Sequence, residues 1–134
     1  MQIQQITIDP DPYQAFRLAQ GYRVGELLFI SGQAAIDGNG QLVGVGNFEA
    51  QAVQVFANLE RVLRAGGSSL ANVIKVTIFL RDMANFPKIV ELRGRYFTPP
   101  YPADTIVEVA SLYSPDALLE IEAIAVADAA VERG

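Results

Sequence analysis

The residues best suited to chemistry in this sequence are two glutamates in an apolar segment. Glu120 and Glu122 lie two residues apart in LLEIEAIAVA (118–127), so a strand places both side chains on one face. Carboxylates among leucine, isoleucine and alanine are costly to bury unless they are paired, hydrogen-bonded or protonated. Either glutamate could instead face solvent at a sheet edge. Glu120 starts the strand beside a loop, where a desolvated carboxylate would suit general acid–base catalysis.

Three further positions could contribute to a site. Asp104 follows a proline-rich approach in PPYPADTIVEV (99–109), where it could face a ligand or simply bond nearby backbone donors as a turn residue. Ser31 and Gly32 lie near the end of another apolar strand, and a glycine there either admits a ligand close to the backbone or marks a β-bulge. Arg93 is either a site residue or a solvated charge on a helix.

The composition excludes several kinds of site. The chain has no cysteine and no histidine, which removes thiol nucleophiles, imidazole bases and every Ser/His/Asp or Cys/His arrangement. The segment GVG (44–46) lacks the third glycine of a dinucleotide loop, and DGNG (37–40) lacks the later acidic ligands of a calcium loop. We therefore expect neither a metal nor a cofactor.

The charge distribution bears on possible partners. The net charge is −5, and the ten basic residues are scattered from Arg17 to Arg133. A basic stripe, the usual sign of nucleic-acid binding, is missing, so we expect no nucleic-acid partner. No run approaches the ~18 apolar residues of a membrane span, and no charged-then-apolar leader precedes the fold. These features predict a cytoplasmic protein without a membrane partner.

The elements that must position these residues follow the order β-β-β-α-β-α-β-β. Asn47 is suited to cap a long helix that Gly66 and Gly67 end. Asn39 and Gly40 favour a type I′ hairpin turn. The expected strands include 1–8, 27–33, 72–80, 104–110 and 118–127; the expected helices cover 48–67, with Phe48, Ala52, Val55, Leu59 and Val62 on one apolar face, and 84–96, with Pro87 in the first turn.

This order predicts one α+β domain over residues 1–134, with one mixed sheet and both helices packed on one face. Strand 72–80 is nearly continuous in β-branched residues and should be buried on both faces or close to it. The strand at 118–127 also carries apolar residues on both sides, and two helices cannot cover both faces of the sheet. Packing against identical subunits would cover the second face, so we expect an oligomer.

The longest recognisable segments are VGELLFISGQ (24–33), NLERVLRAGGSSLANVIKVTIFLRDMANF (58–86), YPA (101–103), and VEVASL with LEIEAIAVA (107–112 and 119–127). Together they resemble the RidA/YjgF family of small trimeric proteins. The resemblance implies a chorismate-mutase-like α+β fold and a homotrimer with ligand sites in clefts between subunits. The best-known members hydrolyse 2-imino acids to 2-keto acids and ammonia.

The resemblance assigns roles residue by residue. It implies that Glu120 is the glutamate associated with the hydrolytic water and that Gly32 is the glycine whose backbone lines the pocket. Deaminating members carry an arginine after the Pro-Ala pair that grips the substrate carboxylate, and that position here is Asp104. An arginine fork binds a carboxylate through two hydrogen bonds, whereas an aspartate repels it. A pocket with Asp104 and Glu120 should therefore favour a cationic or neutral ligand.

Three more positions depart from the family pattern. Leu18 stands where a pocket tyrosine is common, Val90 where the second helix often carries asparagine, and Arg93 where relatives often carry tyrosine. Arg93 or Arg17 would be the substitute anchor if a substrate carboxylate is bound.

The sequence leaves three functions open. The first is a RidA-family imine or enamine hydrolase with an altered substrate range, whose activity on 2-imino acids is weak or absent. The second is a non-catalytic small-molecule-binding or interaction module of the same fold. The third and weakest is an RNA-cleaving translation inhibitor, because RNA contact needs cations and cleavage needs an acid–base pair.

Overall fold

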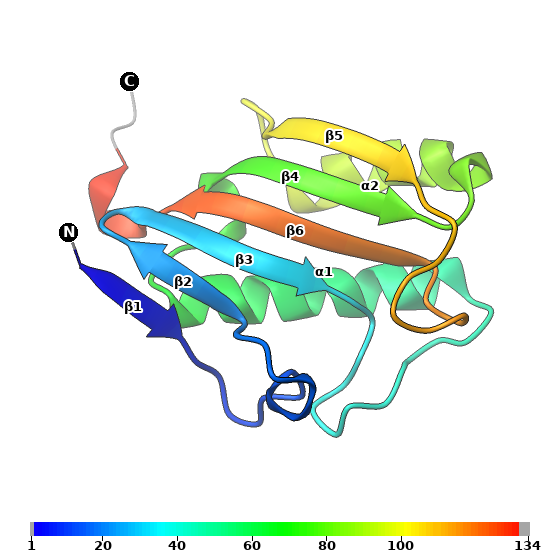
Figure 1. Ribbon diagram of the computed structural model, residues 1–134. Coiled ribbons are helices and arrows are strands. Elements are labelled where there is room, and N and C mark those ends of the chain that lie inside the picture. The colour runs from blue at the N-terminus through cyan, green and yellow to red at the C-terminus, as the bar shows by residue number, and fades with distance from the viewer. Residues whose placement is uncertain (1, 132–134) are drawn as a thin grey trace.

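Six strands form one mixed sheet in the computed structural model of the protein, which describes residues 2–131. The spatial order is β1-β2-β3-β6-β4-β5, and every neighbouring pair is antiparallel except β4 and β5. Both helices lie on the same face of this sheet, and the other face has no helix over it (Figure 1). The strands are β1 (Ile3–Ile6), β2 (Gly21–Val24), β3 (Leu27–Gln33), β4 (Val73–Leu80), β5 (Ala103–Glu108) and β6 (Leu119–Val126), and the helices are α1 (Phe48–Ala65) and α2 (Phe86–Tyr96).

The predicted element order is confirmed, with one strand that the sequence analysis had not located. This is β2, a four-residue strand that pairs with β1 on one side and β3 on the other. The turn at 37–40 does not connect two strands, because a single isolated bridge, between Ile36 and Leu42, spans it. The three N-terminal strands therefore all precede that turn.

The turn at 37–40 is present, but the type I′ geometry expected for it is wrong. A type I′ turn on Asn39 and Gly40 needs positive φ at both residues, and of the two only Gly40 has it, at 79°. Asp37 explains the difference, because its Oδ1 accepts hydrogen bonds from the backbone N–H of Asn39 (2.9 Å) and of Gln41 (3.0 Å). The aspartate thereby holds the start of the turn, and the glycine supplies the one left-handed residue.

Helix α1 begins and ends where the sequence predicts. The side chain of Asn47 accepts a hydrogen bond from the N–H of Ala50 at 3.0 Å, which caps the first turn. Gly67 follows the helix in the left-handed region, with φ at 86°. The predicted apolar face is buried along its whole length against the sheet.

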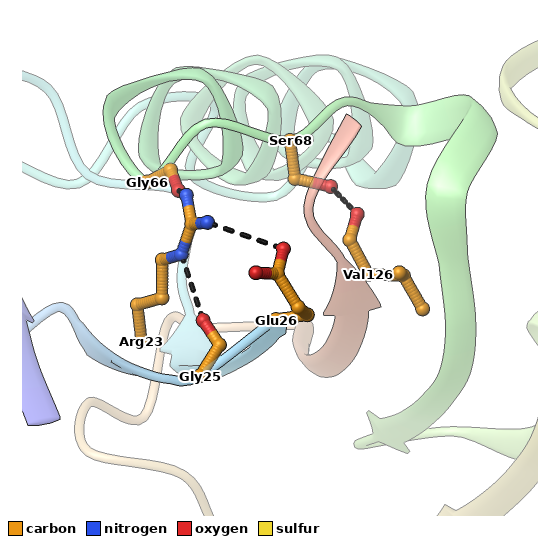
Figure 2. A network of polar contacts seen from close by, with 6 residues as sticks. All are labelled: Arg23, Gly25, Glu26, Gly66, Ser68 and Val126. Carbon is orange, nitrogen blue, oxygen red and sulfur yellow. Dashed lines mark hydrogen bonds and ion pairs between the residues drawn. The ribbon is translucent and has the colours of Figure 1, made fainter. Parts of the chain in front are cut away.

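A small polar network fastens the end of α1 to the sheet (Figure 2). Arg23 donates from Nε to the carbonyl of Gly25 (3.0 Å) and from Nη1 to the carbonyl of Gly66 (3.2 Å), and it pairs with Glu26. Ser68 donates to the carbonyl of Val126 at 2.6 Å. The end of β6 and the β2–β3 turn are thus both tied to the same helix terminus.

The helix-free face of the sheet is incompletely covered. On β4, Val76, Ile78 and Leu80 are buried toward the helices, whereas the alternate residues are only partly buried, so the expected burial on both faces is wrong for the single chain. Tyr22 and Phe29 pair across β2 and β3, and both rings are exposed there. Neighbouring strands therefore present large apolar side chains on this face.

Candidate functional site

A cavity of about 260 Å³ opens beside the end of β3 and the start of β6. Its walls are mainly apolar and aromatic, and Glu120 is the one described lining residue with an acidic or basic side chain. The lining residues are Tyr13, Phe16, Leu18, Gly32, Ala34, Ile36, Tyr113 and Glu120.

Glu120 reaches the cavity because of its register on β6. Its neighbours Leu119 and Ile121 are fully buried in the core under the helices, so alternation along the strand directs Glu120 to the helix-free side. The side chain is half-buried there. The sequence prediction that this glutamate lies at a pocket agrees with its position.

Gly32 makes room for that carboxylate. A β-carbon placed at Gly32 would overlap with Oε1 of Glu120, so any larger residue would displace the acid. The pairing of β3 with β6 also shifts register between Ile30 and Gln33, which is the bulge that the sequence left as an alternative. The bulge is thus confirmed, the group that approaches the Gly32 backbone within this chain is Glu120, and the approach of a ligand stays a prediction.

The environment of Glu120 favours its protonated form. Burial raises the pKa of Glu120 above its usual value, and the nearby charge of Glu122 raises it further. Over residues 2–131, no hydrogen bond or ion pair to the Glu120 carboxylate offsets this effect. Glu122 itself is exposed on the same face, as expected for a solvent-facing acid. Glu120 is therefore able to exchange a proton nearer to neutral pH than an ordinary glutamate.

Tyr13 forms a fixed wall of the cavity, and the sequence analysis did not identify it. Its hydroxyl donates to the carbonyl of Gly32 at 2.6 Å and accepts from the N–H of Ala34 at 3.1 Å. Burial raises the pKa of Tyr13 to about 12, so the phenol stays neutral. Asp11 holds the segment by accepting hydrogen bonds from the Tyr13 N–H (3.0 Å) and the Gln20 side chain (2.8 Å).

Two further aromatic residues at the cavity were also missed. The rings of Phe16 and Tyr113 meet edge to face, with centroids 6.3 Å apart and planes at 68°. They are 56% and 51% exposed, respectively. Burial and the charge of Glu120 together raise the pKa of Tyr113, which places its hydroxyl in the field of that acid. Both residues come from irregular segments, where no periodic pattern marks which side chains face a site.

The remaining predicted site residues are divided between the cavity and other places. Leu18 lines the cavity, as its candidate role requires. Ser31 is directed elsewhere, because its hydroxyl donates to the carbonyl of Ala19 at 2.6 Å. Val90 is exposed on α2, and neither it nor Arg17 belongs to the cavity lining.

Asp104 and Arg93 form an ion pair on the helix side of the sheet. Arg93 donates from Nε to Oδ2 of Asp104 at 2.9 Å, and the two side chains are 26% and 17% exposed. The alternatives of an ordinary turn residue for Asp104 and a solvated surface charge for Arg93 are therefore wrong. The second carboxylate oxygen, Oδ1, is buried and has no hydrogen-bond partner within the described chain.

The single chain does not place Asp104 and Glu120 in one pocket. Asp104 of β5 pairs with Val76 of β4. Glu120 of β6 pairs with Phe79, which lies three residues further along β4. Positions an odd number of residues apart on a strand face opposite sides. The two acids could share a site only if it is completed by a second subunit.

The described part of the chain lacks two other features that would bear on function. No group of three or more acidic, histidine or cysteine residues within 2–131 could hold a metal ion. In the same residues, no helix has both the length and the apolar character needed to cross a membrane.

Comparison with known proteins places this geometry in a family. A family model described as endoribonuclease L-PSP matches residues 9–127. A RutC family protein of Pyrococcus horikoshii is 43% identical over 107 residues, which cover 80% of this chain and 84% of the relative. The chain belongs to the RidA/YjgF (L-PSP, RutC) family.

Two relatives of this RidA/YjgF protein carry more specific information. The crystal structure of RidA from an Antarctic Psychrobacter bacterium superimposes with a TM-score of 0.84 at 35% identity, over 92% of this chain and 98% of that one. A protein of Dermatophagoides farinae that is named 2-iminobutanoate/2-iminopropanoate deaminase is 34% identical over 108 residues, 81% of this chain and 84% of the relative. The fold and family expected from the sequence are thereby confirmed.

Proposed function

We propose that this protein is a hydrolase of carbon–nitrogen bonds in imines, or in enamines that tautomerise to imines, with Glu120 as the residue that activates water. The observation that carries this proposal is the half-buried Glu120 carboxylate, which has a raised pKa and lies in a largely apolar cavity. The similarity to a protein named 2-iminobutanoate/2-iminopropanoate deaminase supports the same class of reaction.

The proposed chemistry needs one group that both accepts and returns a proton. Water adds to the imine carbon, a C–O bond forms, and the Glu120 carboxylate takes a proton from that water. The protonated Glu120 delivers this proton to the nitrogen, which takes the π electron pair of the double bond, and a carbinolamine results. The Glu120 carboxylate then takes the hydroxyl proton and passes it to the same nitrogen, the C–N bond breaks, and its electron pair leaves with ammonia while the carbonyl forms. A carboxyl group whose pKa lies closer to neutral is better suited to both steps.

We further propose an altered substrate range. The position at which the resemblance implies a carboxylate-binding arginine is Asp104, and this acid is already paired with Arg93. A neutral or cationic imine fits this arrangement better than a free 2-imino acid does, because an aspartate repels a carboxylate.

The proposed active form is a homotrimer with its sites in clefts between subunits. The exposed apolar residues of the helix-free face, among them Tyr22 and Phe29, support this assembly, since a second copy would remove them from water. A molar mass of one chain by light scattering at micromolar concentration would contradict it.

A non-catalytic ligand-binding module is the second candidate. The replacements at Leu18, Val90 and Asp104 favour it, because each removes a polar group that the resemblance places near a substrate. RNA cleavage, which the description of the family model suggests, is the weakest candidate. The net charge of −5 disfavours contact with phosphates, and Glu120 has no basic residue beside it in the cavity lining.

Ammonia release decides between the first two candidates. Imines without a carboxylate are generated in the assay by a flavin amine oxidase and 2-imino acids by an amino-acid oxidase, and the decay of each is measured with and without the protein. Glu120→Gln should abolish the added rate, whereas Glu122→Gln, which changes an exposed acid on the same strand face, should retain it. No acceleration by the unaltered protein across small and large imines would favour the binding module.

A further inference from the structure

The cavity at Glu120 combines one acid with a wide apolar lining. Ala34, Ile36, Leu18 and the aromatic rings supply the rest of the surface. An apolar cavity of about 150 Å³ holds a benzene molecule. The volume here, about 260 Å³, leaves room for a ring of that size and a short polar group attached to it.

The aromatic pair at the cavity suits a flat group. The edge-to-face contact between Phe16 and Tyr113 leaves about half of each residue exposed. Aromatic rings prefer offset-stacked or edge-to-face neighbours at 4.5–7 Å, roughly, so a third ring can add to this pair without disturbing it. Tyr13 cannot move aside, since its hydroxyl is bonded to both Gly32 and Ala34.

The acid defines the other end of the ligand. None of the described residues that line the cavity is cationic, and the Glu120 carboxylate occupies the space over Gly32. A protonated nitrogen placed at this carboxylate would supply the missing counter-charge, and nearby ring faces also attract cations. A ligand carboxylate in the same place would be repelled by the negative charge of Glu120, and the apolar lining would do little to screen that repulsion.

We infer that this cavity selects nitrogen compounds with a flat apolar substituent, with the nitrogen at Glu120 and the substituent against Phe16 and Tyr113. The inference rests on the proposed function for the identity of the reacting group, an imine, and adds the class of substituent. Phe16 and Tyr113 are then specificity-determining residues for that reaction.

Three probes test the ligand class on the unaltered protein. Benzylamine carries both the ring and the cationic nitrogen, benzyl alcohol lacks the charge, and methylamine lacks the ring. Calorimetric titration should show benzylamine binding at least roughly tenfold tighter than either of the others. Equal affinities for all three, or no binding of benzylamine up to millimolar concentration, would overturn the inference.

Variants then test the assigned residues. Phe16→Ala and Tyr113→Ala should each weaken benzylamine binding by roughly three- to tenfold, as expected for the loss of one aromatic contact. Tyr101→Ala, which removes an equally exposed ring outside the cavity lining, should leave it unchanged. Glu120→Gln should weaken benzylamine and not benzyl alcohol. Unchanged benzylamine affinity in both aromatic variants would refute their role.

The turnover assay separates this inference from the proposed function. Preferential binding of benzylamine without release of ammonia from any imine would contradict the hydrolase and support the ligand class. Hydrolysis of small and aromatic imines with equal efficiency would support the hydrolase and overturn the inference.

Discussion

Replacing Asp104 with alanine should destabilise the protein by about 2 kcal/mol. The substitution removes a charge-assisted hydrogen bond of 2.9 Å and leaves Arg93, whose side chain is 26% exposed, without its carboxylate partner. Breaking a fully buried pair costs about 3–5 kcal/mol, while an exposed pair contributes about 0–1 kcal/mol, and this pair lies between the two. For 134 residues the entropy of unfolding is about 0.28 kcal/mol/K, so Tm should fall by about 7 °C.

Thermal unfolding followed by circular dichroism at one protein concentration measures this change. A matched control lies on the same helix, where Arg95 pairs with Glu49 at 2.9 Å and both side chains are about half exposed. Arg95→Ala should lower Tm far less than Asp104→Ala or Arg93→Ala. The double variant Asp104→Ala/Arg93→Ala should be less destabilised than the sum of the two single variants. Equal effects of the Arg95 and Asp104 substitutions, or strict additivity within the pair, would refute the account.

The same pair gives a functional test. Asp104→Arg alone brings two guanidinium groups together and should lower Tm at least as much as Asp104→Ala. Asp104→Arg combined with Arg93→Tyr restores the residue types that the family resemblance implies at both positions. Hydrolysis of 2-iminopropanoate should then rise above the level of the unaltered protein, and a folded double variant without that gain would show that the site differs by more than this charge.

Three other substitutions should have distinct effects. Gly32→Ala should displace the Glu120 side chain and abolish imine hydrolysis. The free energy of unfolding should stay within about 1 kcal/mol of the original value, because the overlapping atom is the end of a flexible side chain. Gly94→Ala is the control: a β-carbon there would have no neighbour within 4 Å, and the alanine should stabilise α2. Tyr13→Phe should cost about 1–3 kcal/mol, because it leaves the Gly32 carbonyl and Ala34 N–H without their partner, and an unchanged Tm would contradict this. Because the pKa of Glu120 is raised on folding, the native state loses stability as pH rises from the usual value of 4.5 through the raised pKa. Glu120→Gln should therefore raise Tm at neutral pH and give no such gain below pH 4.5; a constant difference across that range would show that the charge is not responsible.

The fold was predictable where local signals agree with packing. The Asn47 cap, the apolar stripe that follows it and the paired glycines after it mark α1 within the sequence itself. Strand β2 carries no comparable signal, because GYRV (21–24) is short and mixes a charge with an aromatic residue. It is a strand because β1 and β3 pair on both of its sides. That pairing is a property of the assembled sheet rather than of the segment.

From the pattern of residues alone, the site was predictable only in its strand residues, whereas Leu18 was named through the family resemblance. Glu120 and Gly32 lie on neighbouring strands. The alternation of buried and exposed residues along β6 predicts which face Glu120 occupies, and its carboxylate requires a small residue at Gly32. Tyr13, Phe16 and Tyr113 come from a short 3-10 turn and from loops, and no period tells which way such side chains face. Of the eight lining residues only Gly32 and Glu120 lie in strands, so most of the cavity depends on how the segments between strands pack on the sheet.

The contact between Asp104 and Arg93 changes what the substitution at position 104 means. An aspartate that faces the helix layer without a cation would carry the full cost of an uncompensated, mostly buried charge. Arg93 of α2 donates a hydrogen bond to Asp104 of β5 and neutralises its charge. The presence of the arginine is therefore explained by Asp104, without a role in substrate binding. A carboxylate-binding role for Arg93 would have to compete with this pair. Among the described residues that line the cavity, Glu120 is the one whose charge has no partner, and this is the group at which the proposed ligand would place a proton or a positive charge.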